Sequence, residues 1–273
     1  MQTFKAERVA DYQIVYKNEK NIYVYPLLRN DAGEELIHCV SPLHGRSFVL
    51  GRKTDGRWII GKGNGLSYTS CPFLLTSPSF GETWGGLALE NAIRDYDVGN
   101  QVKNLGIKTN KMECVLAFDK SIIVNGVECK SGLLQYSVEC PYRISDFGFI
   151  PHNEFLQYLN KWKVKDEPYY LCATKVLIKN LRILHDNHVM HNAMHPQNYT
   201  WSLELLDFEA SRSDAYPFSN ADYESYVPML IEAEVIQVYE IINYIAWCLG
   251  EIVDYKKTER IFNDYGYKLH PIM

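Results

Sequence analysis

The chain has 273 residues, a formal net charge of −5, 47% hydrophobic residues and 22% charged residues. This composition is typical of a folded globular protein and argues against global disorder. Nucleic-acid-binding proteins usually carry a stripe of Lys and Arg, and the sequence shows none, so we expect no nucleic-acid partner. The apolar stretch 227–253 is interrupted by glutamates, which predicts a core helix and no membrane partner.

The N-terminus and the cysteines predict the compartment. The first residues, MQTFKAERVADYQ, lack a basic region followed by an apolar run, so no signal peptide is readable. The seven cysteines are scattered without a close pair, which argues against a structural zinc site and for reduced thiols. Together these features predict a cytoplasmic protein.

The first half of the chain has the pattern of strands and turns, with one helix. An Asp-Gly pair at 55–56 marks a hairpin turn, and β-branched residues follow it. Apolar residues at helical spacing predict a helix over 87–102. The expected strands cover 22–28, 47–50, 58–60, 112–118, 121–124 and 133–138.

Helices dominate beyond residue 141. We expect them over 153–162, 169–187 and 227–253. A β-rich half with one main helix, followed by a helical half, predicts an α+β fold with two lobes. The expected lobes are residues 1–140 and 141–273.

The segment most informative about chemistry runs from His191 to Glu209. It follows a predicted helix, and a short hairpin would bring Asp207 back beside Asn198. Amide and carboxylate oxygens are hard ligands that suit Mg²⁺ holding a polyphosphate. The segment resembles the catalytic loop and the metal-binding Asp-Phe-Gly of protein kinases, with Asp-Phe-Glu here. A plainer alternative is that His191 and Asn198 only cap backbone groups.

Lys62 is the second candidate, because it directly follows the strand expected at 58–60. A lysine there can reach phosphate oxygens if an acid from a nearby helix orients it. Gly63 and Gly65 would let the backbone approach a phosphate. Taken alone, a lysine after a strand is usually solvated surface.

Three stretches together resemble the selenoprotein O family of kinase-fold AMP-transferases. They are DGRWIIGKGNG at 55–65, the triplet Ile-Arg-Asp at 93–95 and LGIKT at 105–109. The family has a DGR turn, a strand ending in LKGAG, a helix with an Ile-Arg-Glu triplet, and LGIPT. The resemblance covers roughly residues 45–210 and implies a compact, bilobal protein-kinase-like fold that uses ATP with Mg²⁺ or Mn²⁺.

The resemblance also implies roles for individual residues. Lys62 would be the phosphate-binding lysine and Asp95 its helix acid, with Glu90, one helical turn earlier, as the rival. Arg143 resembles a family arginine that contacts the outer phosphate of an inverted ATP. Gly63, Gly65 and Arg143 are thus candidate cofactor-binding residues, and Asn198 and Asp207 the candidate metal ligands.

The sequence also departs from this family. Tyr136 stands where the family has a companion arginine, and Gln197 stands at its catalytic Asp. Ala193 replaces the Asp of the ordinary kinase catalytic loop. His195 is then the best candidate for a general base, since a neutral imidazole can accept a hydroxyl proton near pH 7.

Three functions stay open on the sequence. The favoured one is transfer of AMP from ATP to a hydroxyl of a protein or peptide. The alternative is a kinase that transfers the γ-phosphate to a protein, a peptide or a small molecule. A nucleotide-binding pseudokinase that acts as a binding module is the third, and the missing Asp supports it.

Overall fold

The computed structural model divides into two compact units. The first contains residues 1–100 and 110–142, and the second contains 101–109 and 143–273. The expected division into an N-lobe of residues 1–140 and a C-lobe of residues 141–273 stays a prediction. The residues that the structure describes are 1–17, 25–41, 45–66, 76–77, 82–83, 85–218 and 225–269.

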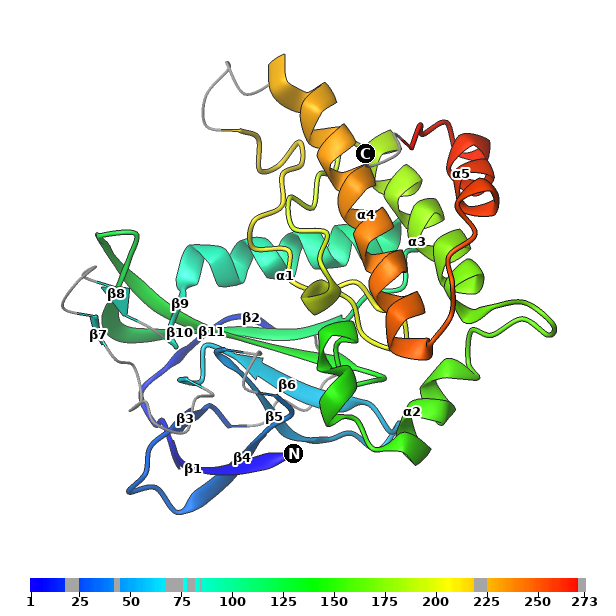
Figure 1. Cartoon of the computed structure of the whole chain (residues 1–273). Coiled ribbons are helices and arrows are strands. Elements are labelled where there is room, and N and C mark those ends of the chain that lie inside the picture. Colours follow the sequence, from blue (N-terminus) through cyan, green and yellow to red (C-terminus); the bar gives the residue numbers. More distant parts are fainter. Residues whose placement is uncertain are drawn as a thin grey trace. The chain divides into compact units, whose positions relative to one another are not determined.

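The first unit is built on one antiparallel sheet, to which nine strands contribute among the described residues (Figure 1). Their bounds are Gln2–Arg8 (β1), Gln13–Lys17 (β2), Leu27–Arg29 (β3), Glu35–Cys39 (β4), Ser47–Arg52 (β5), Trp58–Lys62 (β6), Leu87–Ala88 (β9), Lys111–Val124 (β10) and Val127–Val138 (β11). The order is β2-β10-β11-β6-β5-β4-β1-β3, and β9 pairs with β11. A separate pair is formed by Thr76–Ser77 (β7) and Glu82–Thr83 (β8).

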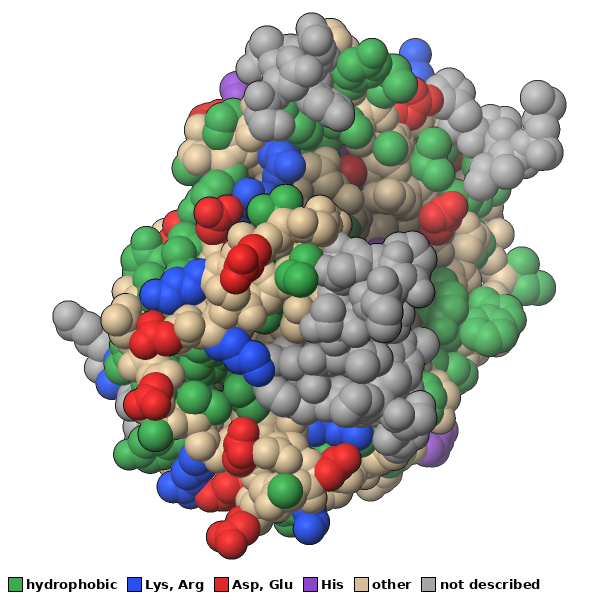
Figure 2. All heavy atoms as spheres, turned by 90° about the vertical axis from the view of Figure 1, so that its left-hand side faces the viewer, with side chains coloured by type: hydrophobic (Ala, Val, Ile, Leu, Met, Phe, Trp, Pro, Cys, Tyr) green, Lys and Arg blue, Asp and Glu red, His purple; other side chains and the backbone are tan. Residues whose placement is uncertain are grey.

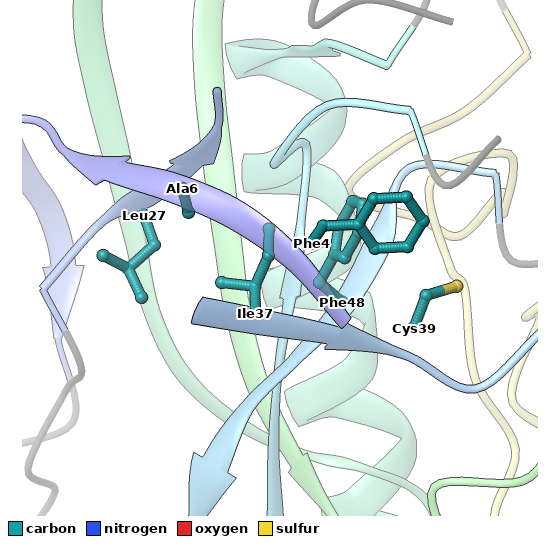
Figure 3. Packing of buried hydrophobic residues seen from close by; sticks show 6 residues of the cluster. All are labelled: Phe4, Ala6, Leu27, Ile37, Cys39 and Phe48. Atoms are coloured by element: carbon teal, nitrogen blue, oxygen red, sulfur yellow. The ribbon is translucent and has the colours of Figure 1, made fainter. Parts of the chain in front are cut away.

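A hydrophobic cluster fixes the edge of this sheet formed by β1, β3, β4 and β5 (Figure 3). In β1, Phe4 and Ala6 are buried while their neighbours are exposed, which is the period of two that a half-buried strand requires. The rings of Phe4 and Phe48 meet edge to face at 5.6 Å. Burial of one such aromatic side chain stabilises the fold by about 1.5–3 kcal/mol.

The hairpin of β5 and β6 confirms the turn predicted from Asp55 and Gly56. Gly56 has φ +85°, a conformation that favours glycine, and Asp55 Oδ1 accepts a hydrogen bond from Arg57 N at 3.0 Å. That bond lowers the pKa of Asp55. Arg57 is buried, and its Nη2 donates to the carbonyl oxygen of Ser137 on β11 at 2.7 Å. The hairpin is therefore tied to the strand that β6 pairs with.

The main helix of the first unit is α1, which runs from Leu89 to Asn104 and continues into the second unit. Its Tyr96 stacks on Tyr16 of β2 with ring centroids 5.1 Å apart. The strands predicted at 112–118 and 121–124 are one strand, β10, with irregular register between Ala117 and Ser121. Of the strand predicted at 22–28, residues 22–24 lie outside the described part of the chain.

The second unit is helical (Figure 1). Its helices are Ile144–Phe149 (η2), His152–Leu159 (α2), Tyr169–Asp186 (α3), Pro196–Asn198 (η3), Val227–Leu249 (α4) and Tyr255–Asp264 (α5). α3 contacts α4 and α5. The carboxylate of Glu251 accepts from the backbone N–H groups of Tyr169 and Tyr170 at 2.8 and 2.9 Å, so the segment after α4 caps the start of α3.

The chain has the α+β fold class predicted from the sequence, with its strands concentrated before residue 140 and its helices dominating after it. Gly250, with φ +66°, ends α4 four residues before the predicted limit. None of the helices within the described ranges has the length and apolar character needed to cross a lipid bilayer. On the face drawn in Figure 2, acidic and basic side chains are interspersed.

Candidate active site

In the first unit, Lys62 and Asp95 form a buried ion pair. Lys62 Nζ lies 2.8 Å from Asp95 Oδ2, and the two side chains are 3% and 1% exposed. Lys62 is the last residue of β6, and Asp95 lies in the second turn of α1. The structure therefore brings together the lysine and the helix acid that the sequence resemblance paired.

Glu90, the rival acid, is exposed in the first turn of α1, whereas Asp95 faces inward. The surface alternative for Lys62 is wrong, since only 2% of the residue is exposed. β11 pairs with β6 on one side of Lys62 and β5 on the other, so the lysine lies in the middle of the sheet. A lysine in such a position is oriented by its acid and has few alternative rotamers.

Gly63 and Gly65 follow Lys62 with φ +99° and +112°, conformations that L side chains rarely adopt. A Cβ on Gly63 would lie 2.9 Å from Leu87 Cβ, so the backbone is packed closely there. The N–H of Gly63 donates to the carbonyl oxygen of Arg46, and that of Gly65 to the carbonyl oxygen of Gly85. These amides are already bonded within the protein. The two glycines are therefore better explained by the local path of the chain than by a role of their amides in binding phosphate.

In the second unit, a tight hairpin sets the spacing between Asn198 and Asp207. Leu206 N donates to the carbonyl oxygen of Asn198 at 2.8 Å, which places Asp207 one residue beyond the bonded pair. The hairpin is held from outside, because Leu205 N donates to the carbonyl oxygen of Lys108 at 3.0 Å. Thr109 Oγ1 in turn donates to the carbonyl oxygen of Leu205 at 2.6 Å. The LGIKT stretch thus supports the segment that carries Asp207.

The amide of Asn198 is oriented by its own loop. Its Nδ2 donates to the carbonyl oxygen of Ala193 at 2.9 Å, so Oδ1 is the amide atom suited to bind a cation. Asp207 is half-buried and has φ +67°, which is rare for a residue with a side chain and is found at functional sites. One amide oxygen and one carboxylate fit Mg²⁺ or Mn²⁺, which take further ligands from water and phosphate.

His191 is fully buried, and its Nε2 lies 2.8 Å from the carbonyl oxygen of Leu206. Its ring also meets that of Phe208 edge to face at 5.2 Å. His191 therefore bonds the backbone of the hairpin, as the plainer reading of the sequence expected for this residue.

His195 is exposed, and its Nδ1 accepts a hydrogen bond from Gln197 N at 3.3 Å. A ring nitrogen that accepts carries no proton, so the neutral ring has its proton on Nε2. In this arrangement His195 is better suited to donate to a phosphate oxygen than to take a proton from a hydroxyl. The base role given to His195 stays a prediction.

Arg143 is 7% exposed and precedes η2. Its backbone pairs with Thr200 of the hairpin, and Ile144 N donates to the carbonyl oxygen of Tyr199 at 2.8 Å. Arg143 N also donates to Asp146 Oδ2 at 2.7 Å. The structure places the arginine beside the hairpin that leads to Asp207, and both belong to the second unit.

Two residues of α4 that the sequence analysis missed hold the loop 191–198. Glu234 is 2% exposed, and its Oε1 accepts from Asn192 N at 2.5 Å. Gln237 Oε1 accepts from Met194 N at 3.1 Å. The second carboxylate oxygen of Glu234 lies 2.8 Å from His185 Nε2. The sequence signal available for these two residues was their spacing of three positions on a largely apolar helix.

Comparisons with known proteins add little to this geometry. No protein-family model matches the sequence, and no curated protein matches it. Among solved structures, WaaP in complex with acyl carrier protein is 9% identical with a TM-score of 0.42, over 81% of this chain and 74% of that one. A Stt7 homolog from Micromonas algae, soaked with ATP, is 14% identical with a TM-score of 0.44, and the match covers 87% of this chain and 80% of that one. At these values neither likeness assigns a function.

Proposed function

We propose that this chain is an ATP- and divalent-metal-dependent transferase. The observation that carries the proposal is the buried ion pair of Lys62 and Asp95. Burying two charges is costly, and apolar residues of similar volume usually stabilise a fold as well or better. Such a pair between a central strand and the main helix is useful where an ammonium group must be held in one place to bind phosphate.

The second unit supplies the proposed metal ligands. Asn198 Oδ1 and the Asp207 carboxylate would bind Mg²⁺ or Mn²⁺, and the ion would neutralise charge on the polyphosphate. The hydrogen bond from Asn198 Nδ2 to Ala193 and the bond between Leu206 and Asn198 support this assignment, because they fix the backbone around both ligands. In the described residues, no group of three His, Cys, Asp or Glu is placed to hold a metal by itself.

The transfer that we favour is that of AMP to a hydroxyl of a protein or peptide. The acceptor oxygen bonds to the α-phosphorus, the bond from that phosphorus to the bridging oxygen breaks, and pyrophosphate leaves. The hydroxyl proton goes to solvent late, because such transition states are loose and depend on positioning and charge. This suits a loop with Gln197 and Ala193 where kinase-fold enzymes carry an Asp.

Arg143 would hold the outer phosphate of the donor, in the role implied by the sequence resemblance. A single guanidinium can bind phosphate through two hydrogen bonds. Transfer of the γ-phosphate is the alternative, and a bound nucleotide whose phosphates lie away from Arg143 would favour it. A cytoplasmic location belongs to the same proposal.

The test is calorimetric titration of the full chain with ATP, in Mg²⁺ and in EDTA. We expect binding to weaken at least about tenfold in EDTA and in Asp207→Asn, which keeps the shape of the residue and removes its charge. Asp264→Asn, on the exposed side of α5, is the matched control and should bind as the wild type does. Absence of ATP binding, or unchanged binding by Asp207→Asn, would refute the proposal.

A further inference from the structure

A cavity of about 490 Å³ lies in the second unit, and neither Asn198 nor Asp207 is among its lining residues. It is bounded by the end of α3, by the first turns of α4, and by the bridge between Met190 and Arg212. Cavities of about 300–1,000 Å³ are the usual size of small-molecule sites. The apolar part of the wall includes Val189, Met190 and Ile231.

The hydroxyl of Ser213, in this wall, has no hydrogen-bond partner among the described residues. Ser213 is 5% exposed, lines the cavity, and its hydroxyl is buried without a hydrogen bond. Leaving a buried hydroxyl unsatisfied costs about 1–3 kcal/mol, so such groups in native proteins usually meet a ligand or water. An acceptor oxygen of a bound molecule would satisfy the Ser213 hydroxyl.

The charged groups of the wall indicate the sign of the ligand. Arg212 Nη1 donates to the carbonyl oxygens of Ala210 and Ser211 at 3.4 and 3.2 Å, and the guanidinium lies 5.5 Å from the centre of the Phe218 ring. These contacts orient the guanidinium next to an aromatic surface, where it can bind an oxyanion through two hydrogen bonds.

The remaining titratable groups of the wall occur as pairs. His188 Nδ1 lies 3.9 Å from Asp214 Oδ1, and both side chains are exposed at the rim. His185 Nε2 lies 2.8 Å from Glu234 Oε2. The two acids in or behind the wall each have a histidine partner. Arg212 contributes a guanidinium to the wall, the type of group that binds an anionic head.

We propose that this cavity binds a small amphipathic anion, with a planar apolar body against Met190, Phe218 and Ile231 and a carboxylate or sulfonate head at Arg212 and Ser213. None of the residues that line the cavity is among those proposed above to bind ATP or the metal. The cavity is coupled to the loop through the backbone, since Met190 and Arg212 exchange two hydrogen bonds at 2.9 and 2.8 Å directly before His191. A bound anion should therefore slow hydrogen exchange at the Met190 amide.

The test uses 8-anilinonaphthalene-1-sulfonate as an anionic probe and N-phenyl-1-naphthylamine as its neutral counterpart, each titrated by fluorescence into the full chain. We expect one saturable site for the anion and affinity at least about tenfold weaker for the neutral probe. Ile231→Glu should weaken the affinity for the anionic probe at least about tenfold, since it places a like charge in the wall. Met229→Glu, on the same helix but 62% exposed, should leave affinity within about twofold.

Arg212→Gln should remove the preference for the anionic probe over the neutral one. The affinity for the neutral probe should stay within about twofold of that of the wild type. If thermal unfolding shows that Ile231→Glu is not folded, Pro217→Glu, at an exposed position of the wall, gives the same test. Several weak sites, or equal binding by the wild type and the wall variants, would refute the cavity as a site. An unchanged preference in Arg212→Gln would refute an anion as its ligand.

Discussion

Lys62 is buried, and this changes what its replacement should do. The sequence suggested an exposed strand-end lysine with little packing, so that loss of Lys62 would reduce activity more than stability. In the structure, truncation of Lys62 removes the ammonium group that pairs with Asp95 and leaves the Asp95 carboxylate buried. Breaking a buried pair on one side usually costs about 3–5 kcal/mol, more than the pair itself contributes.

We therefore predict that Lys62→Ala and Asp95→Ala each lower the free energy of unfolding by about 3–5 kcal/mol. The double variant should lose much less unfolding free energy than the two single variants lose together, because it removes both charges. Urea denaturation of the four proteins measures this coupling. Losses that add within error would mean that the two residues do not stabilise each other.

Arg143 carries the prediction on donor orientation. Arg143→Gln should weaken the affinity for ATP at least about tenfold. The affinity for ADP should stay within about threefold, because only ATP has the outer phosphate. Arg182→Gln, whose guanidinium pairs with Asp186 on the surface of α3, is the control. An unchanged ratio of the ATP and ADP dissociation constants would remove Arg143 from the phosphate site.

At the residue scale, the sequence predicted the partners that lie in short motifs. Asp95 could be matched to Lys62 because both belong to stretches with a family resemblance. Glu234 could not, since the backbone N–H of Asn192 that it binds gives no signal in the sequence. The tautomer of His195 was also beyond prediction, because it depends on the hydrogen bond from Gln197.

At the scale of elements, α4 has a role beyond its apolar faces. Glu234 and Gln237 project from it to the amides of Asn192 and Met194, so the helix sets the path of the loop that carries Asn198. A carboxylate that accepts from a backbone amide and from a histidine is difficult to replace, because each bond is buried.

We predict that Glu234→Ala lowers turnover more than it weakens nucleotide binding, since it loosens the loop and leaves Lys62 in place. Hydrogen exchange at the amides of Asn192 and Met194 should accelerate at least about tenfold. The control is Glu240→Ala, an exposed position on the same helix. Unchanged protection of Asn192 would show that α4 does not hold the loop.

The sequence predicted long periodic elements better than short or polar ones. The limits of α3 differ from the prediction by one residue, because its apolar spacing is strong and a proline precedes it. α5 was missed, although Asp254 caps it by accepting from Lys257 N, since its composition is polar. β1 and β4 were missed because only every second residue is buried.

At the scale of the whole molecule, the proposed chemistry draws on both units. The proposed phosphate-binding pair, Lys62 and Asp95, belongs to the first unit, and the proposed metal ligands, Asn198 and Asp207, belong to the second. The α+β class followed from the change in pattern near residue 141. The pairing of β6 with β11 and β5, which buries Lys62, is a long-range feature that local periodicity does not predict.

The central claim is that the chain transfers AMP from ATP, and parallel labelling tests it most directly. The full chain is incubated with Mg²⁺ or Mn²⁺ and with ATP labelled at either the α- or the γ-phosphate. The chain itself and casein serve as hydroxyl acceptors, and Asp207→Asn serves as the blank.

We predict protein-bound label from the α position, released pyrophosphate, and no protein-bound label from the γ position. Protein-bound label from the γ position alone would contradict AMP transfer and identify a γ-phosphate kinase.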